Sequence, residues 1–193
     1  MDRSANPLFL SFPLGTWLRT SVRMSVFFPI VLIVFWARLG FQLGTICSLL
    51  LLVSVIIHEF FHVFGARLTG GEAHEILIWP AGGLAYCQPG PSFRSEFLTT
   101  AAGPLANVLL AALMLPVVYN SPDFETCFHP IVVPAVLLGD DILQDLALLM
   151  FTLNIKLIYL NLLPVNPLDG GRMLQTVLSR YWDASLVAKV SIW

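Results

Sequence analysis

The residues from Leu43 to Ile57 carry no charge and are mostly Leu, Ile and Val. With the residues up to about Ala66, this apolar stretch is long enough to cross the hydrocarbon core of a bilayer, which takes roughly 20 helical residues. Its end carries two histidines and a glutamate, in the pattern H-E-F-F-H at residues 58–62. Ionisable groups are costly inside a membrane, so these side chains need polar partners or a function.

The spacing of His58 and His62 puts both imidazoles on one face of a helix, one turn apart. One tetrahedral zinc ion can then take a nitrogen from each ring. Glu59 lies beside the first histidine and can act as general base for a water at the metal. The pattern is short, and two core histidines beside an acid are the alternative interpretation. We favour the metal site, because hydrocarbon offers such groups few other partners.

The composition indicates a polytopic membrane protein. Hydrophobic residues make up 57% of the 193 residues and charged residues only 11%, against roughly 25% charged in an average soluble domain. The net charge of −2 supports no interaction with nucleic acid. The three cysteines, Cys47, Cys87 and Cys127, form no C-x-x-C pair, so neither a disulfide framework nor a thiolate zinc site is expected.

Four apolar segments are expected to cross the membrane, at about 24–41, 43–66, 93–119 and 142–163. Between the second and third, residues 70–91 contain Gly and Pro and are predicted to form a β-like loop, with a strand at 74–79, a turn at 80–83 and a second short strand. Residues 20–26 alternate in part and predict a further short strand. We expect an all-α polytopic membrane protein of about four transmembrane helices, with a small β-sheet or hairpin near the cytoplasmic side. Residues 1–193 are expected to form a single membrane-embedded domain.

Arginines indicate the orientation of these spans. With the N-terminus in the cytoplasm, only Arg38 lies in an outer loop, and the connection 120–140 contains no Lys or Arg. The arginines on the cytoplasmic side are then Arg3, Arg19, Arg23, Arg67, Arg94, Arg172 and Arg180. This orientation brings the ends of the second and fourth spans to the same side, together with the histidine pair.

A catalytic zinc usually takes three protein ligands, so a third must come from elsewhere in the chain. His74 lies in the strand-like loop and His129 in the outer connection, and both are poorly placed. Asp169 follows the fourth span on the expected cytoplasmic side, and carboxylate oxygen is an accepted zinc ligand. Its commoner role would be to cap a helix at Gly170. The intramembrane setting favours the ligand role.

Four motifs together resemble those of the site-2 protease family of intramembrane metalloproteases, peptidase family M50. They are HExxH at 58–62, P-A-G-G at 80–83, A-G-P-L-A-N at 102–107 and NxxPxxxxDG at 161–170, in the order that the family shows. The resemblance covers about residues 58–172. The combination of motifs is far more specific than HExxH alone.

This resemblance implies an intramembrane zinc metalloprotease that cleaves a transmembrane protein substrate within or near its membrane segment. His58, His62 and Asp169 would bind one zinc ion per chain, and Glu59 would be the base. Asn161 would lie beside the site and bind the substrate or the developing oxyanion, although an interhelical hydrogen bond is an equal alternative. The protein is then expected in a prokaryotic cell membrane, with its active site toward the cytoplasm.

Some features depart from the family pattern, and for some residues more than one role is possible. Asn107 and Asn154 are interpreted as interhelical packing residues. Lys156 is a charge within the fourth span, facing either a wet cavity or an acid such as Glu59 or Asp145. No PDZ or CBS-type domain is recognisable. Relatives often continue with further helices, so the chain is expected to be a shortened form.

The main alternative is a membrane zinc protein without proteolysis, such as a transporter or sensor. A transport site needs ligands along a path across the bilayer, whereas every ligand candidate here lies at one side. Such a site also has no need for a glutamate between the two histidines. A third alternative is a proteolytically inactive scaffold, against which the intact motif residues argue.

Overall fold

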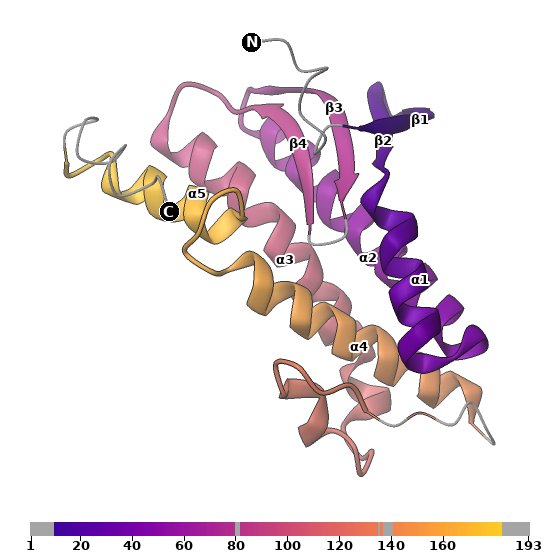
Figure 1. Ribbon diagram of the computed structural model, residues 1–193. Coiled ribbons are helices and arrows are strands. Elements are labelled where there is room, and N and C mark those ends of the chain that lie inside the picture. Colours follow the sequence, from indigo (N-terminus) through magenta and orange to yellow (C-terminus); the bar gives the residue numbers. More distant parts are fainter. Residues whose placement is uncertain (1–9, 80–81, 135, 137–140, 183–193) are drawn as a thin grey trace.

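The computed structural model describes residues 10–79, 82–134, 136 and 141–182, and for residues 82–86 the backbone alone is considered. Figure 1 shows helices gathered beneath a small sheet. The elements in chain order are β1 (Ser11–Trp17), β2 (Thr20–Ser25), α1 (Phe27–Leu39), α2 (Phe41–Leu68), β3 (Glu72–Trp79), β4 (Gly82–Gln88), α3 (Phe93–Val118), η3 (Glu125–Phe128), α4 (Ile142–Asn161) and α5 (Asp169–Leu178).

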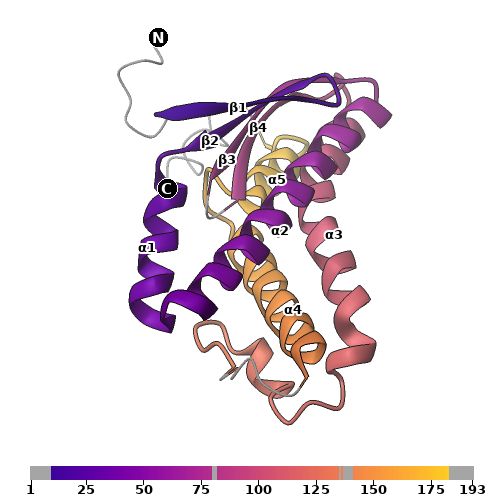
Figure 2. The same ribbon diagram turned by 90° about the vertical axis from the view of Figure 1, so that its right-hand side faces the viewer.

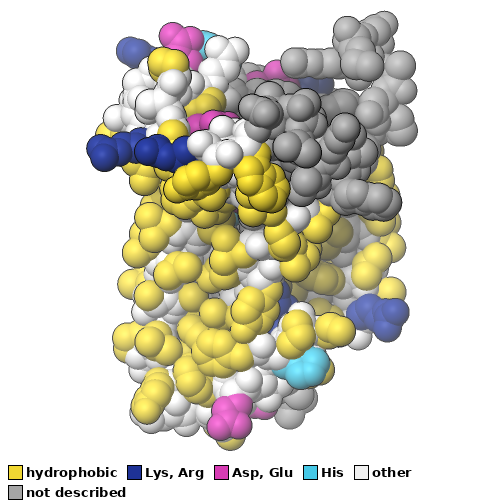
Figure 3. Space-filling model, turned by 90° about the vertical axis from the view of Figure 1, so that its left-hand side faces the viewer, with side chains coloured by type: hydrophobic (Ala, Val, Ile, Leu, Met, Phe, Trp, Pro, Cys, Tyr) yellow, Lys and Arg dark blue, Asp and Glu magenta, His cyan; other side chains and the backbone are white. Residues whose placement is uncertain are grey.

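Three helices among the described residues are long and apolar enough to cross a membrane, namely α2, α3 and α4. They match the second, third and fourth expected spans and indicate an integral membrane protein. The Ser92 side chain caps α3 by accepting a hydrogen bond from the Ser95 backbone N–H (3.1 Å). In the space-filling view, hydrophobic side chains cover most of the helical part of the face (Figure 3).

The helix α1 is shorter than the first span, predicted at 24–41. The helix α1 has 13 residues, or about 20 Å of helix against a hydrocarbon core of about 30 Å. Its expected N-terminal extension is taken by β2, in which Met24 pairs with Ile78 of β3. Sheet pairing with a distant segment therefore overrides the local apolar pattern.

The sheet has four strands in the order β1-β2-β3-β4, with β2 and β3 parallel and the other pairs antiparallel. The predicted strands at 74–79 and 20–26 are confirmed, and β4 provides the second strand of the hairpin. The turn residues 80 and 81 lie outside the described residues. The strand β1 was not predicted from the sequence, because Pro13 and Gly15 are typical of turns. In β1 these two residues flank a bulge.

The turn between β1 and β2 is held by Arg67 at the end of α2. Leu18 and Arg19 both have positive φ (49° and 63°), a conformation that L-residues other than Asn and Asp seldom adopt. The Arg67 guanidinium donates hydrogen bonds to the Leu18 carbonyl (2.8 Å) and to the Thr20 hydroxyl (2.8 Å). This contact attaches the N-terminal hairpin to α2.

The helices α2, α3 and α4 contact one another and form the layer that carries the site, with α1 against the outer side of α2 (Figure 2). The strands β3 and β4 pack on α2. Lys156 of α4 donates a hydrogen bond to the backbone carbonyl of His129 (2.7 Å). The sequence analysis did not anticipate this carbonyl partner, which lies in the connection between α3 and α4.

Candidate metal centre

His58 and His62 lie on one face of α2, as their spacing predicted. Their Nε2 atoms are 3.1 Å apart, and both side chains are buried. The apolar residues that precede them make α2 a spanning helix, and its packing against α3 excludes solvent from this face. Two imidazole nitrogens therefore point to one position inside the helical layer.

Asp169, the first residue of α5, brings a carboxylate to the same position. Its Oδ2 lies 3.1 Å from Nε2 of His58 and 3.3 Å from Nε2 of His62. The N-cap of α5 is Leu168, without a side-chain cap bond, so the helix-cap alternative for Asp169 is wrong. The Asp169 side chain is buried, and as a metal ligand its carboxyl group would be ionised.

We call Nε2 of His58, Nε2 of His62 and Oδ2 of Asp169 the donor triangle. Its edges of 3.1, 3.1 and 3.3 Å are near the ligand–ligand distance of about 3.4 Å in a tetrahedron with metal–ligand bonds of about 2.1 Å. Two imidazoles and one carboxylate are also a usual protein donor set for zinc, leaving one position open. The residues present therefore fit a catalytic zinc ion.

Glu59 is completely buried beside the donor triangle. Its Oε1 lies 3.7 Å from Nε2 of His58. Its carboxylate also groups with both histidines as a possible metal ligand, with all three donor atoms within 4.8 Å of one another. Asp169 is closer to the histidine nitrogens, so we assign the carboxylate corner of the triangle to Asp169. Glu59 then remains within reach of a water molecule at the open position.

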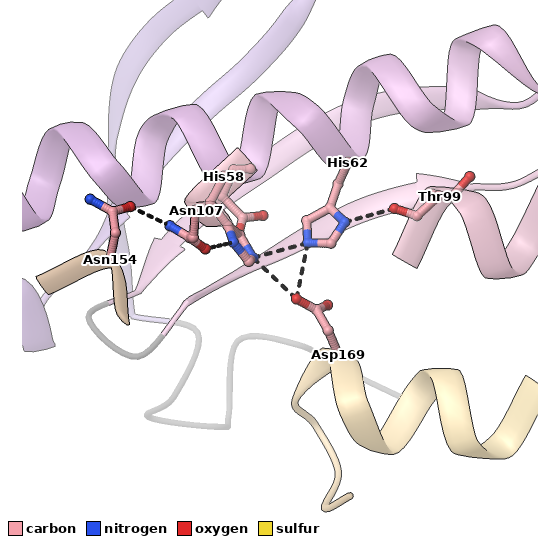
Figure 4. A network of polar contacts seen from close by, with 7 residues as sticks. His58, His62, Thr99, Asn107, Asn154 and Asp169 are labelled. Atoms are coloured by element: carbon pink, nitrogen blue, oxygen red, sulfur yellow. Dashed lines mark hydrogen bonds and ion pairs between the residues drawn. The ribbon is translucent and has the colours of Figure 1, made fainter. Parts of the chain in front are cut away.

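The helix α3 supports both histidines from behind (Figure 4). Nδ1 of His62 lies 2.8 Å from the Thr99 backbone carbonyl, and Nδ1 of His58 lies 2.6 Å from Oδ1 of Asn107. A carbonyl can only accept a hydrogen bond, so His62 carries its proton on Nδ1 and leaves Nε2 free for a metal. Such partners orient the ligands of metal sites.

Gly103 lies between these two contacts, one helical turn from each. A Cβ atom at this position would overlap Nε2 of both His58 and His62. The sequence analysis matched this residue to a family motif without finding its role. It interpreted Asn107 and Asn154 as interhelical packing residues, and their hydrogen bond across helices (2.9 Å) agrees with this. The spacing of Thr99, Gly103 and Asn107 on one helix face could have revealed their shared orientation toward the histidines.

We expect Gly103→Ala to lower zinc affinity by at least about tenfold, a loss typical of disturbed outer-shell partners. The added methyl group has no space unless the histidine rings or the helix α3 move. Zinc binding by the detergent-purified protein, measured by competition with a chromogenic chelator, tests this. Leu105→Ala, at an exposed position of the same helix, should bind zinc as the wild type does. Unchanged affinity in Gly103→Ala would contradict the packing argument.

Asn161 ends α4 and is buried, and its Nδ2 atom has no hydrogen-bond partner among the described residues. The chain then turns so that the Leu162 carbonyl meets Gly170, next to Asp169. The connection of residues 162–168 thus brings the end of α4 next to the start of α5, where Asp169 supplies the carboxylate. Its role toward a substrate stays a prediction.

The remaining histidines make local contacts. His74 pairs with Glu72 on the exposed face of β3 (2.8 Å). His129 accepts hydrogen bonds from the backbone N–H groups of Ile131 and Val132. Neither belongs to the group of possible metal ligands among the described residues.

Known proteins are similar to this chain in sequence and in fold. The model of peptidase family M50 matches residues 46–191. A zinc metalloprotease from Methanocaldococcus jannaschii is 32% identical over 82% of this chain and 39% of its own length. Stage IV sporulation protein FB from Bacillus subtilis is 30% identical over 75% of this chain and 44% of its own. The chain thus spans less than half the length of these relatives. The solved structure of a site-2 protease from Methanocaldococcus jannaschii matches 94% of this chain and 77% of its own, with a TM-score of 0.70 and 27% identity.

Proposed function

The chain belongs to peptidase family M50, and from this we propose that it is a zinc metalloprotease that hydrolyses a peptide bond within or near a transmembrane segment of a membrane-protein substrate. The observation that carries the proposal is the donor triangle with Glu59 beside it, buried among helices of spanning length. His58, His62 and Asp169 would hold one zinc ion per chain.

Zinc at this place would supply Lewis-acid chemistry, polarising the scissile carbonyl and lowering the pKa of the attacking water to about 7. Glu59 would accept the proton of that water and return it to the leaving amine. The complete burial of Glu59 keeps bulk water from competing for this proton. Asn161 would donate a hydrogen bond to the developing oxyanion from its Nδ2 atom, which has no partner among the described residues.

A transmembrane helix hides its carbonyl groups in backbone hydrogen bonds, so a substrate must be locally extended before cleavage. An extended segment can satisfy its freed backbone groups by pairing with the edge of a sheet. Residues 76–79 of β3 and 84–87 of β4 are the two candidates for this pairing. Residues 76–78 of β3 already pair with β4, and β2 occupies its other side. The edge strand β4 is therefore the better candidate.

We place the site on the cytoplasmic side of a prokaryotic cell membrane. The support is the distribution of arginines, because Arg67 at the end of α2 and Arg172 in α5 lie at the same end of the spans as the donor triangle, and Arg38 lies at the opposite end of α2.

Metal removal tests the proposal. The purified protein, reconstituted in lipid nanodiscs, should cleave members of a panel of single-span transmembrane peptides, with products identified by mass spectrometry. Treatment with 1,10-phenanthroline should abolish cleavage, and added zinc should restore it together with about one bound zinc per chain, the number expected for a single three-ligand site. Cleavage that survives complete metal removal would contradict the proposal. Stoichiometric zinc without cleavage of any peptide would favour a transporter or sensor.

A further inference from the structure

We propose that Asn154 of α4 is a positioning residue that, through Asn107, keeps the proton of His58 on Nδ1, so that Nε2 is free to bind the metal. The inference rests on the proposed zinc site. It gives Asn154 a role beyond the helix packing that the sequence predicted for it. A chain of hydrogen bonds runs from Asn154 on α4 through Asn107 on α3 to His58 on α2 (Figure 4). All three side chains are buried.

The donor and acceptor directions in this series of hydrogen bonds are fixed at Asn154, the end farthest from His58. Asn154 lies with one amide atom 2.8 Å from the Met150 backbone carbonyl and 3.0 Å from the Ser54 hydroxyl. A carbonyl can only accept, so the atom facing it must be the Asn154 NH₂ group. Ser54 donates its own proton to the Leu50 carbonyl (2.9 Å) and can therefore accept from Asn154. The amide of Asn154 thus has one permitted orientation.

This orientation is passed on to Asn107. With its NH₂ group committed to Met150, Asn154 presents Oδ1 to its neighbour, and the Asn107 NH₂ group donates to it (2.9 Å). Asn107 then presents its own Oδ1 to His58 at 2.6 Å. An amide oxygen can only accept, so the proton of His58 lies on Nδ1 and its Nε2 lone pair points into the donor triangle.

Without Asn154, the amide of Asn107 can turn over by 180° at little cost, because its oxygen and NH₂ group have nearly the same shape. Its NH₂ group would then donate to Nδ1 of His58. The proton of the ring would move to Nε2, which is the atom that a metal needs unprotonated. A residue on α4 thereby controls a ligand on α2.

The test uses a double substitution in the full chain. We expect Asn154→Leu, which is close in size but cannot hydrogen-bond, to lower zinc affinity by about 10–100-fold, the range for loss of outer-shell partners. In Asn107→Asp both carboxylate oxygens accept, so the acceptor toward His58 no longer depends on Asn154. Adding Asn154→Leu to Asn107→Asp should therefore change zinc affinity by less than about threefold, well below that outer-shell range. Chelator competition gives the affinity, and the visible spectrum of the cobalt(II) form reports the donor geometry.

Thr152→Val is the matched control, since Thr152 is equally buried on α4 and lies outside the chain of hydrogen bonds. It should leave zinc affinity and the cobalt spectrum unchanged, and melting temperatures of all variants monitor packing. An equal loss of affinity in both backgrounds would mean that Asn154 acts only through packing, and no loss in Asn154→Leu would equally overturn the inference. If the variants show the predicted zinc affinities but the wild type cleaves no peptide, the proposed function alone is contradicted. If the wild type cleaves peptides but Asn154→Leu binds zinc as tightly as the wild type, this inference alone is contradicted.

Discussion

Glu59→Gln is expected to abolish peptide cleavage while leaving zinc bound. General acid–base groups contribute about 10²–10⁴-fold to enzyme rates, so the residual activity should fall by about that factor or below detection. Gln has the same shape and fits the fully buried position, but it cannot take a proton from water. Zinc should stay because the donor triangle does not include Glu59. Single-turnover cleavage of a transmembrane peptide and metal analysis of the same sample test both parts.

Glu72→Gln is the matched control for this variant. Glu72 also lies beside a histidine, His74, at 2.8 Å, but on the exposed face of β3. Its substitution should leave both cleavage and zinc content at the wild-type values. Loss of zinc from Glu59→Gln would assign Glu59 to the metal as a ligand, against the geometry argued here. Normal cleavage by Glu59→Gln would show that another group is the base.

Asp169→Ala is expected to remove most of the zinc and, with it, the activity. The variant leaves two imidazoles from a single helix, and the third corner of the donor triangle becomes empty. The loss of zinc affinity should exceed the roughly 10–100-fold typical of outer-shell substitutions, because a direct ligand is lost. Chelator competition measures the affinity, and peptide cleavage at saturating zinc measures whether metal restores the rate.

Asp141→Ala provides the comparison, because Asp141 is the N-cap of its helix, whereas Asp169 is not. The Asp141 carboxylate caps α4 by accepting a hydrogen bond from the Gln144 backbone N–H (3.1 Å). Its loss should cost about 1 kcal/mol of stability and leave zinc affinity unchanged. Full zinc content in Asp169→Ala would show that its closeness to the histidines is a hydrogen-bonding contact only.

Local pattern determined a large part of this protein. The spans at 43–66, 93–119 and 142–163 were predictable because apolar length is a property of consecutive residues, and α2, α3 and α4 confirm them. The pairing of His58 with His62 was predictable for the same reason, since helical periodicity alone brings residues four apart to one face. The strand at 74–79 followed from its β-branched and aromatic residues between turn formers.

Tertiary structure decided what depends on distant contacts. The length of α1 results from the pairing of β2 with β3, a segment far away in the chain that no local window reports. The strand β1 pairs with its chain neighbour β2, but Pro13 and Gly15 hide it from a local pattern. The position of Asp169 after the fourth span and the motif around it both predicted a ligand, but only the packing of α5 brings its carboxylate within 3.3 Å of both histidines. The donor and acceptor directions in the series of hydrogen bonds from Met150 to His58 are likewise a property of three packed helices. Each hydrogen bond fixes the direction of the next only when the side chains are in contact. The residue types and their order therefore predicted that a metal site exists, and the packing of α2, α3, α4 and α5 determined which atoms form it.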